Sequence, residues 1–290
     1  MPQSVKDQSN YPLISPTSRL QGLWENGGFA LTLQLPPLLT ANASNFVKQL
    51  ATQIPAFDAV LTADAPDGAI AISSLAMAAM LKRAGIETVV QISGRDRNRL
   101  ALQSDLLGLG ALDIHTLLVD MRPLTRESLG QNADARLVTD LDGAALLATA
   151  IRMRDEGRFI AGASIKKRPV FYIGVFFSLE QSIESAALNC AQFIVTTPVD
   201  DVQRFIAALR NFQTIHADFL STRPLLVSLP LIPGHPGDTL DEGEANIQQI
   251  VTSIEALKSF KEIRGFNIVV ARQHDLSMLE QVVRAVDLQR

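Results

Sequence analysis

The chain has 290 residues, 47% of them hydrophobic and 19% charged, which is typical of a globular protein with strands buried on both faces and excludes a disordered one. Its formal net charge of -4, without any long run of Lys or Arg, argues against nucleic acid and anionic membrane as partners. The one cysteine excludes an internal disulfide and a cysteine-based zinc site. A polar start and the lack of a long apolar run predict a cytoplasmic protein that does not cross a membrane.

After a polar leader, residues 1–28, short apolar runs alternate with longer amphipathic segments, an order typical of βα units. We expect strands at 29–35, 58–62, 88–93, 116–119, 159–163, 192–196, 224–230 and 265–270. The expected helices are 44–53, 69–84, 97–112, 142–156, 179–189, 202–212, 245–260 and 276–288. Eight such units predict an α/β protein with a (β/α)8 TIM barrel, a single domain over residues 29–290.

Three features leave alternatives open. A second apolar run, 170–177, follows the fifth expected strand. It could form a loop across the barrel mouth, an extra strand, part of the hydrophobic core or a contact between subunits. An open doubly wound sheet is the alternative fold, but the first strand ends in Q-L-P-P rather than in a glycine-rich turn. The long segment 231–244 contains two Pro-Gly pairs and is a candidate lid or binding loop.

Polar residues that follow the expected strands are the candidates for chemistry, because barrel active sites lie at the carboxyl ends of the strands. The densest group is S-G-R-D-R-N-R at 93–99, where arginines meet the start of a helix, a combination that suits phosphate or carboxylate. The alternative is that Asp96 caps this helix and that the arginines pair with nearby carboxylates. Thr62, Asp64 and Thr196 end other strands, where they either bind a ligand or form turns and strand edges.

The four histidines, His115, His216, His235 and His274, lack the i, i+4 spacing of a helical metal pair. The sequence therefore predicts no metal. His235 lies between Gly234 and Pro236 in the long loop, and it is either a functional histidine or an ordinary solvated residue.

The segment 91–112, Q-I-S-G-R-D-R-N-R-L-A-L-Q-S-D-L-L-G-L-G-A-L, resembles the third βα unit of methylenetetrahydrofolate reductases. The resemblance continues with P-P at 36–37, F-I-V-T-T-P at 193–198 and R-G-F-N-I-V-V at 264–270. It implies a barrel that binds FAD, takes hydride from NADH or NADPH, and reduces the methylene group of a folate or a similar pterin.

With this resemblance the candidates fall into three roles. Those expected to bind the cofactor are Thr62, Gln91, Ser93, Arg95, Asp96, Arg97 and Arg122. The catalytic candidates are Asp120, Asp64 and His235, and the substrate-binding ones are Gln34, Thr196 and Thr197.

This sequence departs from the family at several polar positions. Leu33 stands where the family has a proton-delivering Glu, and Thr197 where it has a Gln that contacts folate. Arg122 falls at the family's Gly-Asp, which leaves Asp120 as the nearest carboxylate. Two other functions therefore stay open: a non-catalytic relative that acts as a partner subunit or ligand-binding module, and a flavin-free one-carbon carrier protein. The chain then forms either a homo-oligomer or a complex with a partner subunit.

Overall fold

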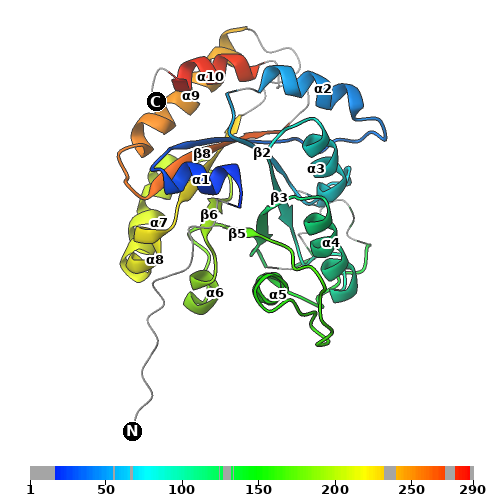
Figure 1. The fold of residues 1–290 in the computed structure, drawn as a ribbon. Coiled ribbons are helices and arrows are strands. Elements are labelled where there is room, and N and C mark those ends of the chain that lie inside the picture. The colour runs from blue at the N-terminus through cyan, green and yellow to red at the C-terminus, as the bar shows by residue number, and fades with distance from the viewer. Residues whose placement is uncertain are drawn as a thin grey trace.

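The computed structural model describes residues 17–54, 56–65, 68–123, 125–126, 132, 134–231, 240–271 and 278–287. Within them, eight parallel strands pair in sequence order, and the first strand pairs with the last, so the sheet closes on itself. Helices surround this closed sheet (Figure 1). The structure confirms the predicted (β/α)8 TIM barrel and excludes an open doubly wound sheet.

The strands follow the order that the sequence predicts, with one exception, and two helices, at Arg19–Glu25 and Ala217–Thr222, are additional to the predicted ones. The strands are β1 Ala30–Gln34, β2 Ala59–Thr62, β3 Thr88–Ile92, β4 Thr116–Asp120, β5 Tyr172–Phe177, β6 Phe193–Thr196, β7 Leu225–Leu231 and β8 Ile263–Val270. The helices are α1 Arg19–Glu25, α2 Ser44–Gln53, α3 Ser74–Arg83, α4 Arg99–Ala111, α5 Gly143–Asp155, α6 Ser185–Asn189, α7 Val202–Ile215, α8 Ala217–Thr222, α9 Leu240–Leu257 and α10 Leu279–Asp287. None of the helices in the described part of the chain has the length and apolar character needed to cross a membrane.

The fifth strand was placed wrongly at 159–163. That segment folds back on itself, since the Phe159 N–H donates to Ala163 O at 3.0 Å and Gly162 has a φ of 89°. The apolar run that follows supplies β5, and all six of its residues are buried. A barrel strand is covered on both faces, and only the second run is apolar enough to meet that requirement.

Two apolar clusters result from the alternation of side chains along each strand. On β4, Leu117 and Val119 belong to the larger cluster between the strands and the helices, whereas Leu118 belongs to the smaller cluster inside the barrel. By the same alternation Asp120, the last residue of β4, faces the barrel interior. The closed sheet thus brings a carboxylate to the carboxyl-terminal end of the barrel.

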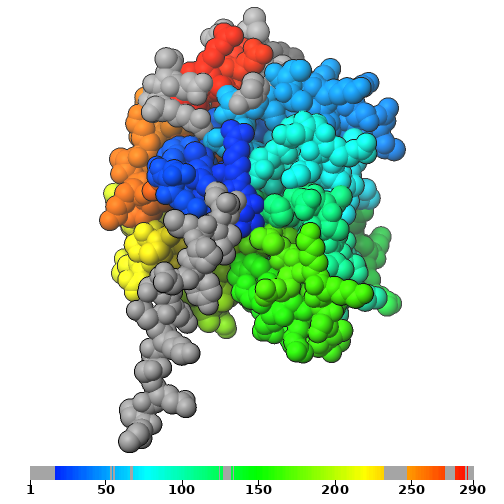
Figure 2. Space-filling view, in the orientation of Figure 1, coloured from blue at the N-terminus to red at the C-terminus, as the bar shows by residue number. Residues whose placement is uncertain are grey.

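Part of the predicted polar leader, α1, covers the opposite end of the barrel. The Trp24 ring lies 5.4 Å from Phe193 and 6.0 Å from Tyr172, and its indole N–H donates to Arg264 O at 3.0 Å. Leu20 is fully buried in the same inner cluster. In the space-filling view the blue α1 segment is surrounded by segments from distant parts of the chain (Figure 2). These side chains fill the amino-terminal end, so a ligand reaches the interior from the other end. The placement of the domain boundary after residue 28 stays a prediction.

Candidate functional site

A cavity of about 710 Å³ lies at the carboxyl-terminal end of the barrel, where active sites of this fold are found. Its volume is in the range of small-molecule sites. Among the described residues, its polar lining comes from Gln34, Gln91, Arg122 and Asn132. Its apolar lining includes Leu35, Pro37, Leu39, Ile70, Phe176, Pro198 and Val269. The site therefore has mostly apolar walls with a few convergent polar groups.

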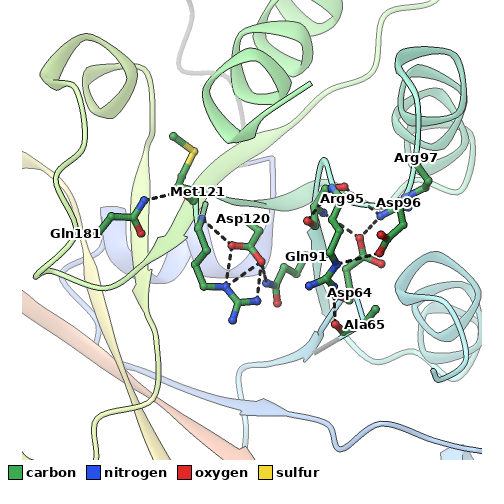
Figure 3. A network of polar contacts seen from close by, with 11 residues as sticks. Asp64, Ala65, Gln91, Arg95, Asp96, Arg97, Asp120, Met121 and Gln181 are labelled. Atoms are coloured by element: carbon green, nitrogen blue, oxygen red, sulfur yellow. Dashed lines mark hydrogen bonds and ion pairs between the residues drawn. The ribbon is translucent and has the colours of Figure 1, made fainter. Parts of the chain in front are cut away.

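Asp120 organises the polar side of this cavity. Its carboxylate accepts hydrogen bonds from Gln91 Nε2 at 3.0 Å, from the Arg122 backbone N–H at 3.0 Å and from Arg122 Nη2 at 2.8 Å (Figure 3). The Arg122 guanidinium also lies 5.1 Å from the centre of the Phe176 ring, a distance typical of a cation–π contact. Asp120 is 4% exposed, so it acts mainly by holding Gln91 and Arg122 in place. The structure thus brings three predicted site residues together.

A second polar network surrounds Asp64, beside the cavity. The carboxylate accepts a hydrogen bond from the Ser93 N–H at 2.9 Å and forms an ion pair with Arg97 (Figure 3). Burial raises the pKa of the Asp64 carboxyl above its ordinary value, while Arg97, the Ser93 N–H group and Arg95 act in the opposite direction. This network joins the ends of β2 and β3.

The arginines of the 93–99 segment direct their donors to protein atoms. Arg95 donates to Asp96 at 2.9 Å and to Ala65 O at 2.6 Å, and Arg97 Nη1 donates to Asp105 at 2.8 Å. These contacts favour the alternative of ion pairing over anion binding, although Arg95, Asp96 and Arg97 line an adjoining cavity of about 380 Å³.

Asp96 does not cap α4. Asn98 is the N-cap residue, and its side chain accepts from Leu100 N and Ala101 N at 3.1 and 3.0 Å. Asp96 instead has a φ of 67°, and its carboxylate pairs with Arg95. Of the alternative that the sequence left open, capping by Asp96 is therefore excluded, whereas the ion pairs of the arginines are present.

Thr62 and Ser93 do not line the cavity that contains Gln91 and Arg122. The Thr62 hydroxyl lies 3.5 Å from Val89 O, beside a small space of about 20 Å³ that Leu38 and Met77 also line. The Ser93 hydroxyl accepts from the Arg95 N–H at 3.1 Å. The Thr62 hydroxyl is thus near Val89 O, whereas the Ser93 hydroxyl keeps its own proton to donate, and the flavin-binding role that the resemblance implies for these residues stays a prediction.

The substrate-binding candidates separate in the same way. Gln34 lines the cavity, and its Oε1 accepts from Asn267 Nδ2 at 3.4 Å. Thr196 is buried, and its hydroxyl accepts from the Ser228 N–H at 3.0 Å, so it joins β6 to β7. Thr197 is half-buried and its N–H donates to Phe177 O at 3.1 Å. Only Gln34 of these three therefore lines the cavity with its side chain.

Two polar residues inside the barrel were missed by the sequence analysis. Asn267 and Ser228 are fully buried, and Asn267 Nδ2 donates to Ser228 Oγ at 3.1 Å. Thr32 Oγ1 donates to Asn267 Oδ1 at 2.9 Å. The available signal was a polar residue in the middle of each apolar strand, since buried polar groups need hydrogen-bond partners.

His235 lies outside the described residues. Elsewhere in the described chain, no group of three or more His, Cys, Asp or Glu side chains is arranged to hold a metal ion. The roles of His235 and the absence of a metal both stay predictions.

No protein-family model matches this chain. No curated protein matches it either. Among solved structures, an uncharacterized protein from Clostridium thermocellum that binds two copies of 5-methyl-5,6,7,8-tetrahydrofolic acid aligns with a TM-score of 0.64, 11% identity, and coverage of 94% of this chain and 100% of its own.

Other similar structures have different activities. A GH18 chitinase from Pseudoalteromonas aurantia aligns with a TM-score of 0.52 and 11% identity over 90% of this chain and 100% of its own. An oxaloacetate acetylhydrolase aligns with a TM-score of 0.52 and 14% identity over 95% of this chain and 90% of its own. Because one barrel fold serves many chemistries, these similarities show that the chain is a TIM barrel.

Proposed function

We propose that this protein binds a reduced pterin of the tetrahydrofolate type in the cavity at the carboxyl-terminal end of the barrel. The observation that carries the proposal is the buried Asp120 carboxylate, which holds the Gln91 amide and the Arg122 guanidinium at the wall of a cavity of about 710 Å³. Preorganised polar groups of this kind fix the orientation of a ligand whose remaining surface is apolar.

A pterin matches the lining of this cavity in polarity. The faces of its rings suit apolar contact, and Phe176, Ile70 and Leu39 line the cavity. Its edge carries both donors and acceptors, which suit the amide and guanidinium held by Asp120. The Clostridium protein that binds 5-methyl-5,6,7,8-tetrahydrofolic acid supports the proposal, since its barrel covers 94% of this chain.

Calorimetric titration with 5-methyltetrahydrofolate tests the proposal. Calorimetry is preferable to intrinsic fluorescence because the one tryptophan, Trp24, lies at the other end of the barrel. We expect saturable binding that Asp120→Asn weakens by about 10- to 100-fold, since Asn cannot hold both Gln91 Nε2 and Arg122 as a carboxylate does. Asp140→Asn is the matched control, because Asp140 pairs with Arg99 on the exterior. No binding by the parent protein, or equal binding by Asp120→Asn, would refute the proposal.

The finer hypothesis from the resemblance, reduction of a methylene-pterin through FAD with NADH or NADPH, depends on a flavin site. Thr62 and Arg95 contact carbonyl oxygens of the protein, and the Ser93 hydroxyl keeps a proton that it could donate to such a ligand. The absorbance spectrum of the purified protein after addition of FAD tests it independently of pterin binding. A bound flavin would restore the reductase hypothesis, and a colourless protein that binds 5-methyltetrahydrofolate would favour a flavin-free pterin-binding protein.

A further inference from the structure

Two glutamine amides, Gln34 and Gln91, line the cavity, and their hydrogen bonds to other protein groups show which end of each amide, oxygen or nitrogen, faces it. Ser228 Oγ lies 2.7 Å from Thr196 O, and a carbonyl only accepts, so the serine donates its one hydroxyl proton there. Ser228 Oγ can then only accept from Asn267, which must present its Nδ2 at 3.1 Å.

The orientation of the Asn267 amide in turn determines the orientation of the Gln34 amide. Thr32 donates to Asn267 Oδ1 at 2.9 Å, in agreement with this orientation of the amide. The second Nδ2 proton of Asn267 points to Gln34 at 3.4 Å, where only the Oε1 atom can accept it. Gln34 Nε2 is therefore the atom left to face the cavity that Gln34 lines.

Asp120 orients the Gln91 amide the other way round, with its nitrogen toward the protein. A carboxylate only accepts, so Gln91 must present Nε2 to Asp120 Oδ2 at 3.0 Å. Gln91 Oε1 is then the atom left to face the cavity. One amide thus offers a donor to a ligand, and the other offers an acceptor.

These two atoms are placed to meet one edge of the same ring. Gln34 ends β1 and Gln91 lies in β3, separated by β2 and two residues further along the strand direction, so their Cα atoms are about 12 Å apart. The residue after β2 at this edge is Ala63, which also lines the cavity and takes little space. The two long side chains can reach toward a ring that lies above Ala63.

We infer that the Ser228–Asn267 relay and Asp120 set Gln34 as a donor and Gln91 as an acceptor, so that the cavity selects a 2-amino-4-oxo pterin ring over a 2,4-dioxo ring. This inference rests on the proposed function and adds the basis of its specificity. The 2-amino group of a pterin donates to Gln91 Oε1, and ring N1 accepts from Gln34 Nε2. In the 2,4-dioxo ring, an oxo group replaces the 2-amino group and N1 carries a hydrogen. An acceptor then faces Gln91 Oε1 and a donor faces Gln34 Nε2, so both contacts become repulsive.

The test compares the affinities of 6-methylpterin and 6-methyllumazine, which differ in this edge. We expect the parent protein to prefer 6-methylpterin by at least about tenfold. Ser228→Ala removes the hydroxyl that orients Asn267, so Asn267 and Gln34 can both turn over, and we expect the preference to fall to about twofold or less. A role in stability alone would weaken the binding of both probes without changing their ratio.

Gln34→Glu is a second variant, which keeps an acceptor for Asn267 but replaces the N–H group at the cavity with an oxygen. It should also lose the preference for 6-methylpterin. Thr116→Val is the matched control, since the Thr116 hydroxyl is buried in the same barrel without a hydrogen-bond partner. It should keep the preference of the parent.

The outcomes separate the two ideas. If the parent binds neither 5-methyltetrahydrofolate nor 6-methylpterin, the proposed function and this inference are both wrong. If it binds 5-methyltetrahydrofolate but shows no preference between the two probes, or if Ser228→Ala and Gln34→Glu keep the preference, the inference is wrong and the proposed function stands.

Discussion

Individual charged residues in this protein act chiefly through their partners. Asp120 and Asp64 are both buried carboxylates at strand ends, yet only Asp120 holds side chains that line the larger cavity. Asp64 is engaged with Arg97 and the Ser93 N–H, which makes it part of the support of β2 and β3. The sequence analysis treated both as catalytic candidates because a strand end alone does not show which partners a carboxylate meets.

The ion pair between Arg99 and Asp140 predicts how the stability of the fold depends on pH. Hydrogen bonds from the Arg99 side chain and backbone lower the pKa of Asp140 from 3.8 to about 2. Because the pKa of Asp140 is lower in the folded protein, the pair stabilises the fold at pH values above the ordinary pKa of an aspartate. This contribution is lost as the pH falls from about 4 through 2. Asp140→Asn should therefore be slightly less stable than the parent near neutral pH and equal to it below the pKa. Urea midpoints measured across this pH range check it, and a constant difference would contradict it.

At the scale of elements, the two ends of the barrel are built differently. At the amino-terminal end, aromatic side chains from α1, β5 and β6 pack together in a buried apolar core. At the other end the strands finish in polar residues such as Gln34 and Asp120, and a cavity remains. One end thus supplies stability and the other is available for binding, which agrees with the general division of labour in this fold.

The contacts of Trp24 predict how much α1 contributes. Trp24→Ala removes a ring packed against Tyr172 and Phe193, and we expect a loss of about 3–5 kcal/mol in the free energy of unfolding. Trp24→Phe keeps most of the packing but loses the hydrogen bond to Arg264 O, so its loss should be about 1 kcal/mol. Urea unfolding followed by far-UV circular dichroism measures both. Similar losses in the two variants would show that packing is not the main contribution.

At the scale of the whole molecule, closure of the sheet joins residues from distant parts of the chain. β1 pairs with β8, which brings Gln34 beside Asn267, and β7 pairs with β8, which brings Ser228 to the same place. The relay to Gln34 thus depends on closure and cannot form in any fragment that lacks β7 or β8. The specificity of the cavity and the integrity of the barrel are therefore linked.

A chain of residues 29–290 tests the predicted boundary after the leader. The structure places Leu20 and Trp24 inside the barrel, so we expect this shortened chain to unfold at a lower urea concentration than Trp24→Ala in the full chain. The reason is that both apolar side chains are lost, which leaves the aromatic rings of β5 and β6 open to water. An unfolding midpoint equal to that of the full chain would support a leader that is independent of the barrel.

The sequence by itself determined the class of fold and most of the strands, because alternating short apolar runs and amphipathic segments report which faces of each element are buried. It also placed Asp120, Arg122 and Gln34 among the site candidates, since the carboxyl ends of barrel strands form the site whatever the family, and the family resemblance added Gln91. Two apolar runs competed for the fifth strand, and local pattern could not choose between 159–163 and β5. Pairing with β4 and β6 made that choice, because only a run apolar on both sides can lie between two strands and the helix layer.

Only the tertiary structure decided which polar groups face a ligand. Arg95 and Arg97 pair with residues that follow β2, and Ser228 and Asn267 orient Gln34 from the far end of the chain. The hydrogen-bonded partners lie between 30 and 233 residues apart in the sequence, so a local sequence pattern cannot reveal them. Hydrogen bonds are short and directional, and the role of a buried polar atom is therefore settled by its neighbours in space rather than by its neighbours in the chain.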